Sequence, residues 1–414
     1  MTIDVPVPVP EAAPGFDVTA PVPAAVPGFD GALGQHGTDA PAPAVAPAAP
    51  AHAAVPADAA AHAAIAADAI EIHETAPAKV NLTLLVSPEV RGGRHRLSSV
   101  FTALELADSL HVTYDPAGPE RLDFSLCSAA GLPELDIPPE ENIVLQALRR
   151  FEEKRGGRFM GSLTVHLTKA IPAAAGLGGG SSDAAAMIRA LARLDGLSPD
   201  AAICRQTAAA VGSDVSFFLA GGCALVGAEG QQIAEHFELS PLDVLLVKPA
   251  VGISTAQVYQ RFDRELEAAQ GGQASQAAQG GQAASAVGAG QATPTDQATP
   301  AAPATPPDQP APAGNGLAGL LRGTPASTAQ EVAQFMENNL EPAALALCPE
   351  CRTIIEQLKA QDGVLKAMVS GSGSTVFALC ESQAAALAAA RWFAQPGQPG
   401  HWTCVTRTTP ASET

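Results

Sequence analysis

Residues 169–183 restrict the fold of this chain more than any other segment, because four glycines fall there within a few positions. The segment reads KAIPAAAGLGGGSSD and is expected to join a strand, Leu163–Leu167, to an alanine-rich helix that begins near Ser182. Glycine permits positive φ and close approach of the backbone, so successive N–H groups can point at one anion. The first amides and the dipole of the following helix favour negative charge at the same place. We therefore predict a phosphate-binding loop here, in preference to a flexible linker or a generic tight turn.

The loop does not follow the common nucleotide-binding patterns. No Lys-Ser or Lys-Thr pair follows the last glycine, so it is not a Walker A loop. Ser181 stands where a dinucleotide-binding fingerprint needs its third glycine. The catalytic triplets of protein kinases are also missing from the sequence.

Charge and composition exclude several classes of partner. The net charge is -19 and the sequence pI is about 4.8, so no long-range field attracts the chain to nucleic acid or to an anionic membrane. An anionic ligand must therefore be held by a local device. The start of the chain has no basic and apolar leader, and no run of roughly 18 apolar residues could span a bilayer. These features predict a cytoplasmic protein with no nucleic-acid or membrane partner.

The seven cysteines are dispersed and odd in number, which favours reduced thiols over a disulfide scaffold. Cys348 and Cys351 form a C-x-x-C pair, but no second pair or histidine cluster stands near it in the sequence to complete a zinc site. Two thiols on a helical segment are the favoured interpretation, and a redox or metal role is the alternative.

Two compositionally biased segments divide the chain. Residues 1–70 are rich in alanine and proline, and residues 268–315 consist of Gln-Gly-Gly-Gln and Ala-Thr-Pro fragments. Neither segment can bury enough apolar surface to offset the entropy of ordering it, so both are predicted to be disordered. The remainder mixes predicted strands and helices without a strict βαβ rhythm, which indicates an α+β fold.

Five further motifs accompany the glycine loop. Lys79 and Asn81 lie in APAKVNL, and Asp214 lies in VGSDVSFF. Thr255 and Tyr259 lie in GISTAQVY, and later segments read NNLEP and SGSGSTVF. Alone, Lys79 would be interpreted as a solvated edge charge and Asp214 as a turn or capping carboxylate. Apolar neighbours in the sequence would make a buried Asp214 costly without a purpose, and Lys79 is its natural partner.

Together these motifs resemble those of the GHMP kinases, whose phosphate loop reads P-x-x-x-G-L-G-G-G-S-S-D-A-A. Within that superfamily, the segments after residue 250 are similar to those of the 4-diphosphocytidyl-2-C-methyl-D-erythritol kinases. The resemblance covers about Thr75 to Thr406, interrupted by the insertion. It implies an amino-terminal α+β domain over 71–229 and a ferredoxin-like α+β domain over 230–267 and 316–409, with the active site between them.

The resemblance also implies an activity and a set of site residues. The chain would transfer phosphate from ATP, with Mg²⁺, to the 2-hydroxyl of a cytidine diphosphate sugar-alcohol, in the non-mevalonate route to isoprenoids. Lys79 and Asp214 would be catalytic, and Asn81, Arg94, His95, Thr255 and Tyr259 would bind the acceptor. The protein ligands of Mg²⁺ stay unidentified. The residues implied in ATP binding are Pro172, Ala173, Ala174, Ala175, Gly176, Leu177, Gly178, Gly179, Gly180, Ser181 and Ser182.

One departure from the family pattern leaves alternatives open. The family's D-G-Y-H appears here as Gly92-Gly93-Arg94-His95, so the tyrosine that stacks on cytosine is replaced by arginine. An arginine can stack on a base through its planar guanidinium. A GHMP kinase acting on homoserine or mevalonate is one alternative, and a catalytically inactive metabolite sensor is another. The sensor is disfavoured because both Lys79 and Asp214 are present. We expect a monomer or a weak homodimer.

Overall fold

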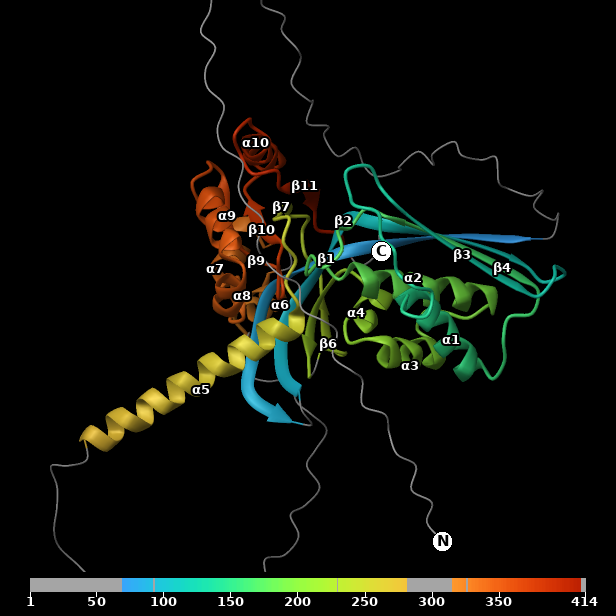
Figure 1. Ribbon diagram of the computed structural model, residues 1–414, viewed down its shortest axis with the longest axis horizontal. Coiled ribbons are helices and arrows are strands. Elements are labelled where there is room, and N and C mark those ends of the chain that lie inside the picture. The colour runs from blue at the N-terminus through green and yellow to red at the C-terminus, as the bar shows by residue number, and fades with distance from the viewer. Residues whose placement is uncertain (1–68, 92–93, 229, 281–314, 325–326, 411–414) are drawn as a thin grey trace, which may run out of the picture. The chain divides into compact units, whose positions relative to one another are not determined.

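The computed structural model describes residues 69–91, 94–228, 230–280, 315–324 and 327–410 (Figure 1). The segments predicted to be disordered are 1–70 and 268–315, and of these residues 1–68 and 281–314 lie outside the described residues. At the edges of both segments the structure differs from the prediction. Ile70 begins a strand, and the helix that begins at Thr255 continues to Gly280.

The first sheet is built around a long antiparallel hairpin of two strands, β1 and β2. Its strand order is β3-β4-β2-β1-β8, while β5 pairs with β2 and β6 pairs with β5. The strands are β1 (Ile70–Arg91), β2 (Arg94–Asp115), β3 (Arg121–Ser128), β4 (Ser162–Lys169), β5 (Cys223–Gly227), β6 (Gln232–Phe237) and β8 (Glu337–Asn338).

Four helices cover one face of this sheet, as Figure 1 shows in green. Strand residues alternate between the two faces, so Ile72, Val112 and Val165 are buried against the helices. Glu71 and His73, on either side of Ile72, are exposed on the opposite face. The helices are α1 (Ile143–Arg155), α2 (Gly179–Leu194), α3 (Ala202–Val211) and α4 (Val215–Ala220).

The second sheet has four antiparallel strands in the order β11-β7-β10-β9. A helical connection joins β7 to β9, and α10 joins β10 to β11, which is the βαββαβ order of a ferredoxin-like unit. Leu245 and Leu246 face separate apolar clusters, so the sheet is buried on both faces. The strands are β7 (Asp243–Lys248), β9 (Val364–Val369), β10 (Val376–Cys380) and β11 (Trp402–Arg407).

The helices of this second part pack on both sides of its sheet. With the two sheets they confirm the predicted α+β class. The first sheet continues through β6 to Phe237, beyond the boundary that the sequence suggested at residue 229. The helices are α5 (Thr255–Gly280), α6 (Asn315–Gly323), α7 (Ala329–Phe335), α8 (Glu341–Leu347), α9 (Pro349–Lys359) and α10 (Gln383–Phe393). Among the described residues, no helix is both long and apolar enough to cross a membrane.

Candidate active site

The glycine loop joins the end of β4 to the start of α2, as the sequence predicted. The helix begins at Gly179, earlier than the expected start near Ser182. Gly176 and Gly178 both have φ of +74°, a conformation that favours glycine, whereas Gly179 and Gly180 are already helical. The first amides of a helix have no acceptor within it, so the amino-terminal turn of α2 can donate to an anion.

A cavity of about 400 Å³ lies beside this loop. The predicted residues from Pro172 to Ser181 all line it, while Ser182 is buried next to them. The opposite wall comes from β3 and from the segment that leads into α1. It consists of Leu126, Leu135, Ile137, Glu141, Asn142 and Ile143. The cavity thus places backbone amides opposite a partly apolar wall.

A buried ionic cluster fixes the beginning of the loop, and the sequence analysis missed it. Lys169 donates through Nζ to Asp108 and, over 2.5 Å, to Oδ2 of Asp183. The other oxygen of Asp108 accepts from the backbone N–H groups of Ala170 at 2.6 Å and Ile171 at 2.8 Å. Lys169 and Asp183 are the first and last residues of the loop segment, so the sequence could have indicated them. Asp108 lies on β2, and only the fold brings it next to Lys169.

Burial and the charges of the cluster shift the pKa values of two members. Burial opposes the charged form of Lys169, but the carboxylates of Asp183 and Asp108 outweigh it and raise the pKa of Lys169. Burial, together with the nearby Asp108 carboxylate, raises the pKa of Asp183 well above its usual range. The hydrogen bonds of Lys169 and Asp108 hold the beginning of the loop in place.

Lys79 lies on β1 directly beside the loop. Its backbone N–H donates to the carbonyl of Leu177 at 2.9 Å, and its Nζ donates to Oδ1 of Asn81 at 2.6 Å. The ammonium group also lies 4.4 Å from the ring centroid of Phe101. Burial lowers the pKa of Lys79 from 10.5, although the Asp214 carboxylate opposes this shift.

Asp214 immediately precedes α4, and its Oδ2 lies 3.6 Å from Nζ of Lys79. The pairing expected from the sequence is therefore present. The expectation of a buried carboxylate was wrong, because 31% of the Asp214 side chain is exposed, compared with 6% for Lys79. Of the two side chains, Lys79 is the one removed from solvent, while Asp214 stays partly exposed.

Thr255 and Tyr259 lie in the first turns of α5, in the second part of the structure. The hydroxyl of Thr255 is 2.8 Å from that of Ser372. Burial raises the pKa of Tyr259 to about 12, and the negative charge of Asp214 adds to the rise. The negative charge of Asp214 thus acts on the Tyr259 hydroxyl, as expected for residues of one site.

His95 contacts α5 from the hairpin of β1 and β2. Its ring centroid lies 5.8 Å from that of Tyr259. Its Nδ1 bonds the carbonyl of Ser87 and its Nε2 bonds Oδ1 of Asp263, both at 2.7 Å. Protein atoms thus occupy both ring nitrogens, Tyr259 stacks against the ring, and only 8% of the His95 side chain is exposed. Arg94 precedes it and is exposed at the end of the hairpin.

A loop of the second part, residues 370–375, closes over the glycine loop. Ser370 donates through Oγ to the carbonyl of Gly176 at 3.1 Å, and the backbone N–H of Thr375 donates to Ala175 at 3.2 Å. A Cβ on Gly176 would lie 2.5 Å from the carbonyl oxygen of Ser370. This SGSGST segment was matched to the family but given no role, since sequence spacing alone does not show what it touches.

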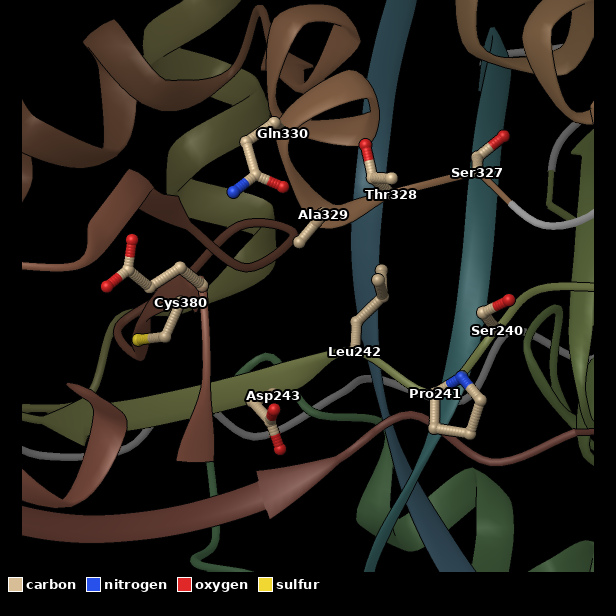
Figure 2. A pocket seen from close by; sticks show the side chains of 10 residues that line it. Ser240, Pro241, Leu242, Asp243, Ser327, Thr328, Ala329, Gln330 and Cys380 are labelled. Atoms are coloured by element: carbon tan, nitrogen blue, oxygen red, sulfur yellow. The ribbon is translucent and has the colours of Figure 1, made fainter. Parts of the chain in front are cut away.

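A second cavity, of about 330 Å³, contains none of the predicted site residues. Figure 2 shows Leu242 and Asp243, at the start of β7, on one side of it, and Thr328 and Gln330, at the start of α7, on the other. Its lining lacks both a glycine loop and a lysine. The first cavity is therefore the candidate nucleotide-binding part of the active site. Lys79 and Asp214 do not line it, but Lys79 adjoins it through the bond of its backbone to Leu177.

The sequence of this chain matches known protein families. The model of the GHMP kinases N terminal domain matches residues 142–222, and that of the GHMP kinases C terminal matches residues 317–397. The 4-diphosphocytidyl-2-C-methyl-D-erythritol kinase of Hyphomonas neptunium is 35% identical over 333 residues, which cover 79% of this chain and 93% of that protein. This chain belongs to the 4-diphosphocytidyl-2-C-methyl-D-erythritol kinase family. The family member from Pelotomaculum thermopropionicum is 33% identical, covering 77% of this chain and 92% of its own length.

Solved structures agree with this membership. A crystal structure of a 4-(cytidine 5'-diphospho)-2C-methyl-D-erythritol kinase aligns with a TM-score of 0.55 and 26% identity, over 82% of this chain and all of that one. Homoserine kinase from Cytophaga hutchinsonii aligns with a TM-score of 0.53 at 18% identity, which shows a shared fold. The superfamily and family inferred from the motifs are thus confirmed, and with them the two-domain GHMP kinase fold.

Proposed function

We propose that this chain transfers the γ-phosphoryl group of ATP to the 2-hydroxyl of 4-diphosphocytidyl-2-C-methyl-D-erythritol, a step of the non-mevalonate pathway to isoprenoid precursors. One observation carries the proposal. In a chain 35% identical to a kinase of that name, the Lys79 and Asp214 pair lies 3.6 Å apart, and the Lys79 backbone is bonded to the glycine loop.

The triphosphate of ATP fits the amino-terminal end of α2. The residues from Gly176 to Ser181 line the cavity and present the first amides of the helix, which attract phosphate through hydrogen bonds and the helix dipole. Leu135 and Ile137 on the opposite wall provide apolar surface for the nucleotide base. The 370–375 loop would keep the glycine loop in this shape while the nucleotide binds.

The residues next to the loop also fit Mg²⁺. Oγ of Ser182 and Oδ1 of Asp183 are buried and make no hydrogen bond with any residue that the structure describes. Mg²⁺ prefers such oxygen ligands and usually combines one or two of them with phosphate oxygens. We propose that these two oxygens hold the ion, which would neutralise charge on the β- and γ-phosphates.

The reaction needs a base and a cation beside the attacking oxygen. The acceptor hydroxyl would lose its proton to a carboxylate oxygen of Asp214 as its oxygen bonds the γ-phosphorus, and the bond from that phosphorus to the bridging oxygen of ADP would break. Lys79 would orient Asp214 and stabilise the developing negative charge. The partial exposure of Asp214 is consistent with this role, because the proton acceptor must be reached by the substrate.

The remaining predicted residues would bind the acceptor or position the groups that do. Asn81 holds Lys79 and is itself fixed by Ser99 at 2.9 Å, so it would act by positioning the ammonium group. Thr255 and Tyr259 would contact the acceptor from α5. His95 would act by keeping the hairpin against α5 beside Tyr259, and Arg94 would stack on the cytosine or pair with the diphosphate.

The identity of the product tests this proposal. With ATP and the cytidylyl acceptor, we expect ADP and an acceptor that carries one new phosphate on its 2-hydroxyl, located by phosphorus NMR. An acceptor that lacks the 2-hydroxyl should release no ADP. A phosphate at another position, or binding of ATP and acceptor with no transfer, would contradict the proposal; the second result would favour the inactive sensor.

A further inference from the structure

Three histidines lie side by side on the face of the first sheet that the helices leave uncovered. His73 on β1 is paired with His111 on β2, and His111 is also paired with His166 on β4. Their neighbours Ile72 and Val112 point into the core below α1 and α2, so the histidines point away from it. None of the three histidines lines the cavity beside the glycine loop.

Two of these histidines and a glutamate are close enough to share a metal ion. The rings of His73 and His111 are stacked, with centroids 4.0 Å apart and planes at 7°. Glu71 is two residues before His73 on the same strand and therefore projects from the same face. One ligand atom from each of the three residues lies within 4.8 Å of the others.

We propose that Glu71, His73 and His111 form a binding site for a divalent transition metal, with Zn²⁺ as the ion that their chemistry fits best. Two imidazoles and one carboxylate are a recurrent zinc set, in which water completes the tetrahedron. Zn–N distances of about 2.0–2.1 Å place tetrahedral ligand atoms roughly 3.3 Å apart. Because the two rings are stacked nearly parallel, they must turn toward one ion to share it, and the exposed Glu71 and His73 side chains have room to do so.

The ion would connect the two central strands of the sheet. It would join β1 to β2 on the face that the helices leave uncovered. Strand β1 also carries Lys79. His166 is not needed as a ligand, because its Nδ1 bonds Oγ of Ser125 at 2.8 Å. It lies beside His111 as an outer neighbour. The expected consequence of binding is therefore greater stability of the sheet, and the chemistry of the kinase site is not involved.

Metal titration of the full chain tests the proposal. Co²⁺ should bind at a single site with ligand-field absorption and without the charge-transfer bands of thiolate ligands, and Zn²⁺ should displace it. His73→Ala and His111→Ala should each weaken Zn²⁺ binding by more than about tenfold, since even an outer-shell partner of a metal is worth ~10–100-fold. Zn²⁺ should also raise the melting temperature of the wild-type chain and leave that of the double variant unchanged.

His236→Ala is the matched control, since this histidine is exposed on β6 outside the cluster and its loss should leave Zn²⁺ affinity unchanged. Glu71→Gln keeps the size of the side chain, and it should weaken binding even if a histidine variant fails to fold. Undiminished Zn²⁺ affinity in the double histidine variant, or cobalt spectra dominated by thiolate bands, would overturn the proposal.

Discussion

Lys79 is the residue whose environment bears most directly on the proposed chemistry. Burial lowers its pKa from 10.5, with partial opposition from Asp214, so in the free enzyme its ammonium group loses the proton at lower pH than an ordinary lysine does. Because the charged form is the active one, kcat/KM should fall as the pH rises through that lowered pKa. The pH profile of kcat/KM reports the free enzyme and is the appropriate measurement.

Lys79→Arg provides the comparison for that profile. Arginine keeps its charge to above pH 12, so the variant should lose the alkaline decline while having a lower rate throughout. Tyr259→Phe should leave the position of the decline unchanged, because the pKa of Tyr259 is about 12. An identical alkaline decline in the arginine variant would show that another group causes it.

Asp214→Asn should lower kcat by about 10² or more, since it removes both the proton acceptor and the charge opposite Lys79. The side chain is partly exposed and the substitution preserves its size, so the melting temperature and the Kd for ATP should change little. Steady-state kinetics and calorimetry measure these quantities. Turnover near the wild-type rate would rule out the proposed base.

Arg94 tests how the acceptor is recognised. If its guanidinium stacks on the base, Arg94→Ala should raise KM for the cytidylyl acceptor by several-fold to about thirtyfold, equivalent to roughly 0.5–2 kcal/mol. KM for ATP should not change. Arg94→Tyr should recover part of the loss by restoring a stacking face. If the acceptor KM is the same in all three proteins, this end of the hairpin does not contact the base.

At the scale of an element, the glycine loop depends on the loop from the second part that packs on it. Gly176→Ala would force a side chain into a φ of +74° and place Cβ 2.5 Å from the carbonyl of Ser370. We expect the Kd for ATP to rise by at least about tenfold, which corresponds to 1.4 kcal/mol. Gly319→Ala in α6 is the control, because its Cβ would enter open space. Equal ATP affinity in both variants would mean that the loop shape is not required.

The helices show which local signals sequence patterns can and cannot supply. The apolar spacing of residues 142–154 predicts a helix, and the side chain of Asn142 does cap α1 by accepting from the backbone N–H of Val144 at 2.9 Å. Ser198 followed by Pro199 predicts a helix that begins at Pro199, and this boundary is wrong. The carbonyl of Ser198 accepts from the backbone of Ala201 at 2.9 Å, so a turn comes first and α3 begins at Ala202.

The candidate site shows the same limit across larger distances. Lys79, Asp214 and the loop were predictable because each lies within a short, ordered motif. Asp108 was not, because its role depends on a contact with Lys169 across two strands of the sheet. Likewise, the family resemblance implies that His95 binds the acceptor, whereas in the structure its Nε2 bonds Asp263, a residue 168 positions away. Sequence patterns name residue types, while tertiary contacts decide which atoms remain available.

At the scale of the whole molecule, the insertion between α5 and α6 should be dispensable. Replacing 281–314 by a short Gly/Ser linker leaves both helices intact and should leave kcat/KM nearly unchanged. The cost of closing a loop changes by only about 0.6 kcal/mol for each doubling of its length, so the shorter chain should melt at the same or a slightly higher temperature. Loss of a cooperative melt would show that the replaced residues contribute to the fold.

The choice of acceptor tests the central claim most directly, because many alcohols could in principle reach a site built on this fold. The measurement is kcat/KM for ADP release with the cytidylyl acceptor, compared under the same conditions with homoserine, mevalonate and galactose. We predict that the cytidylyl acceptor exceeds each of the others by at least about 10³, as expected where a site is built to bind polar groups that the alternatives lack. A comparable or higher value for any of the other three alcohols would contradict the proposed function.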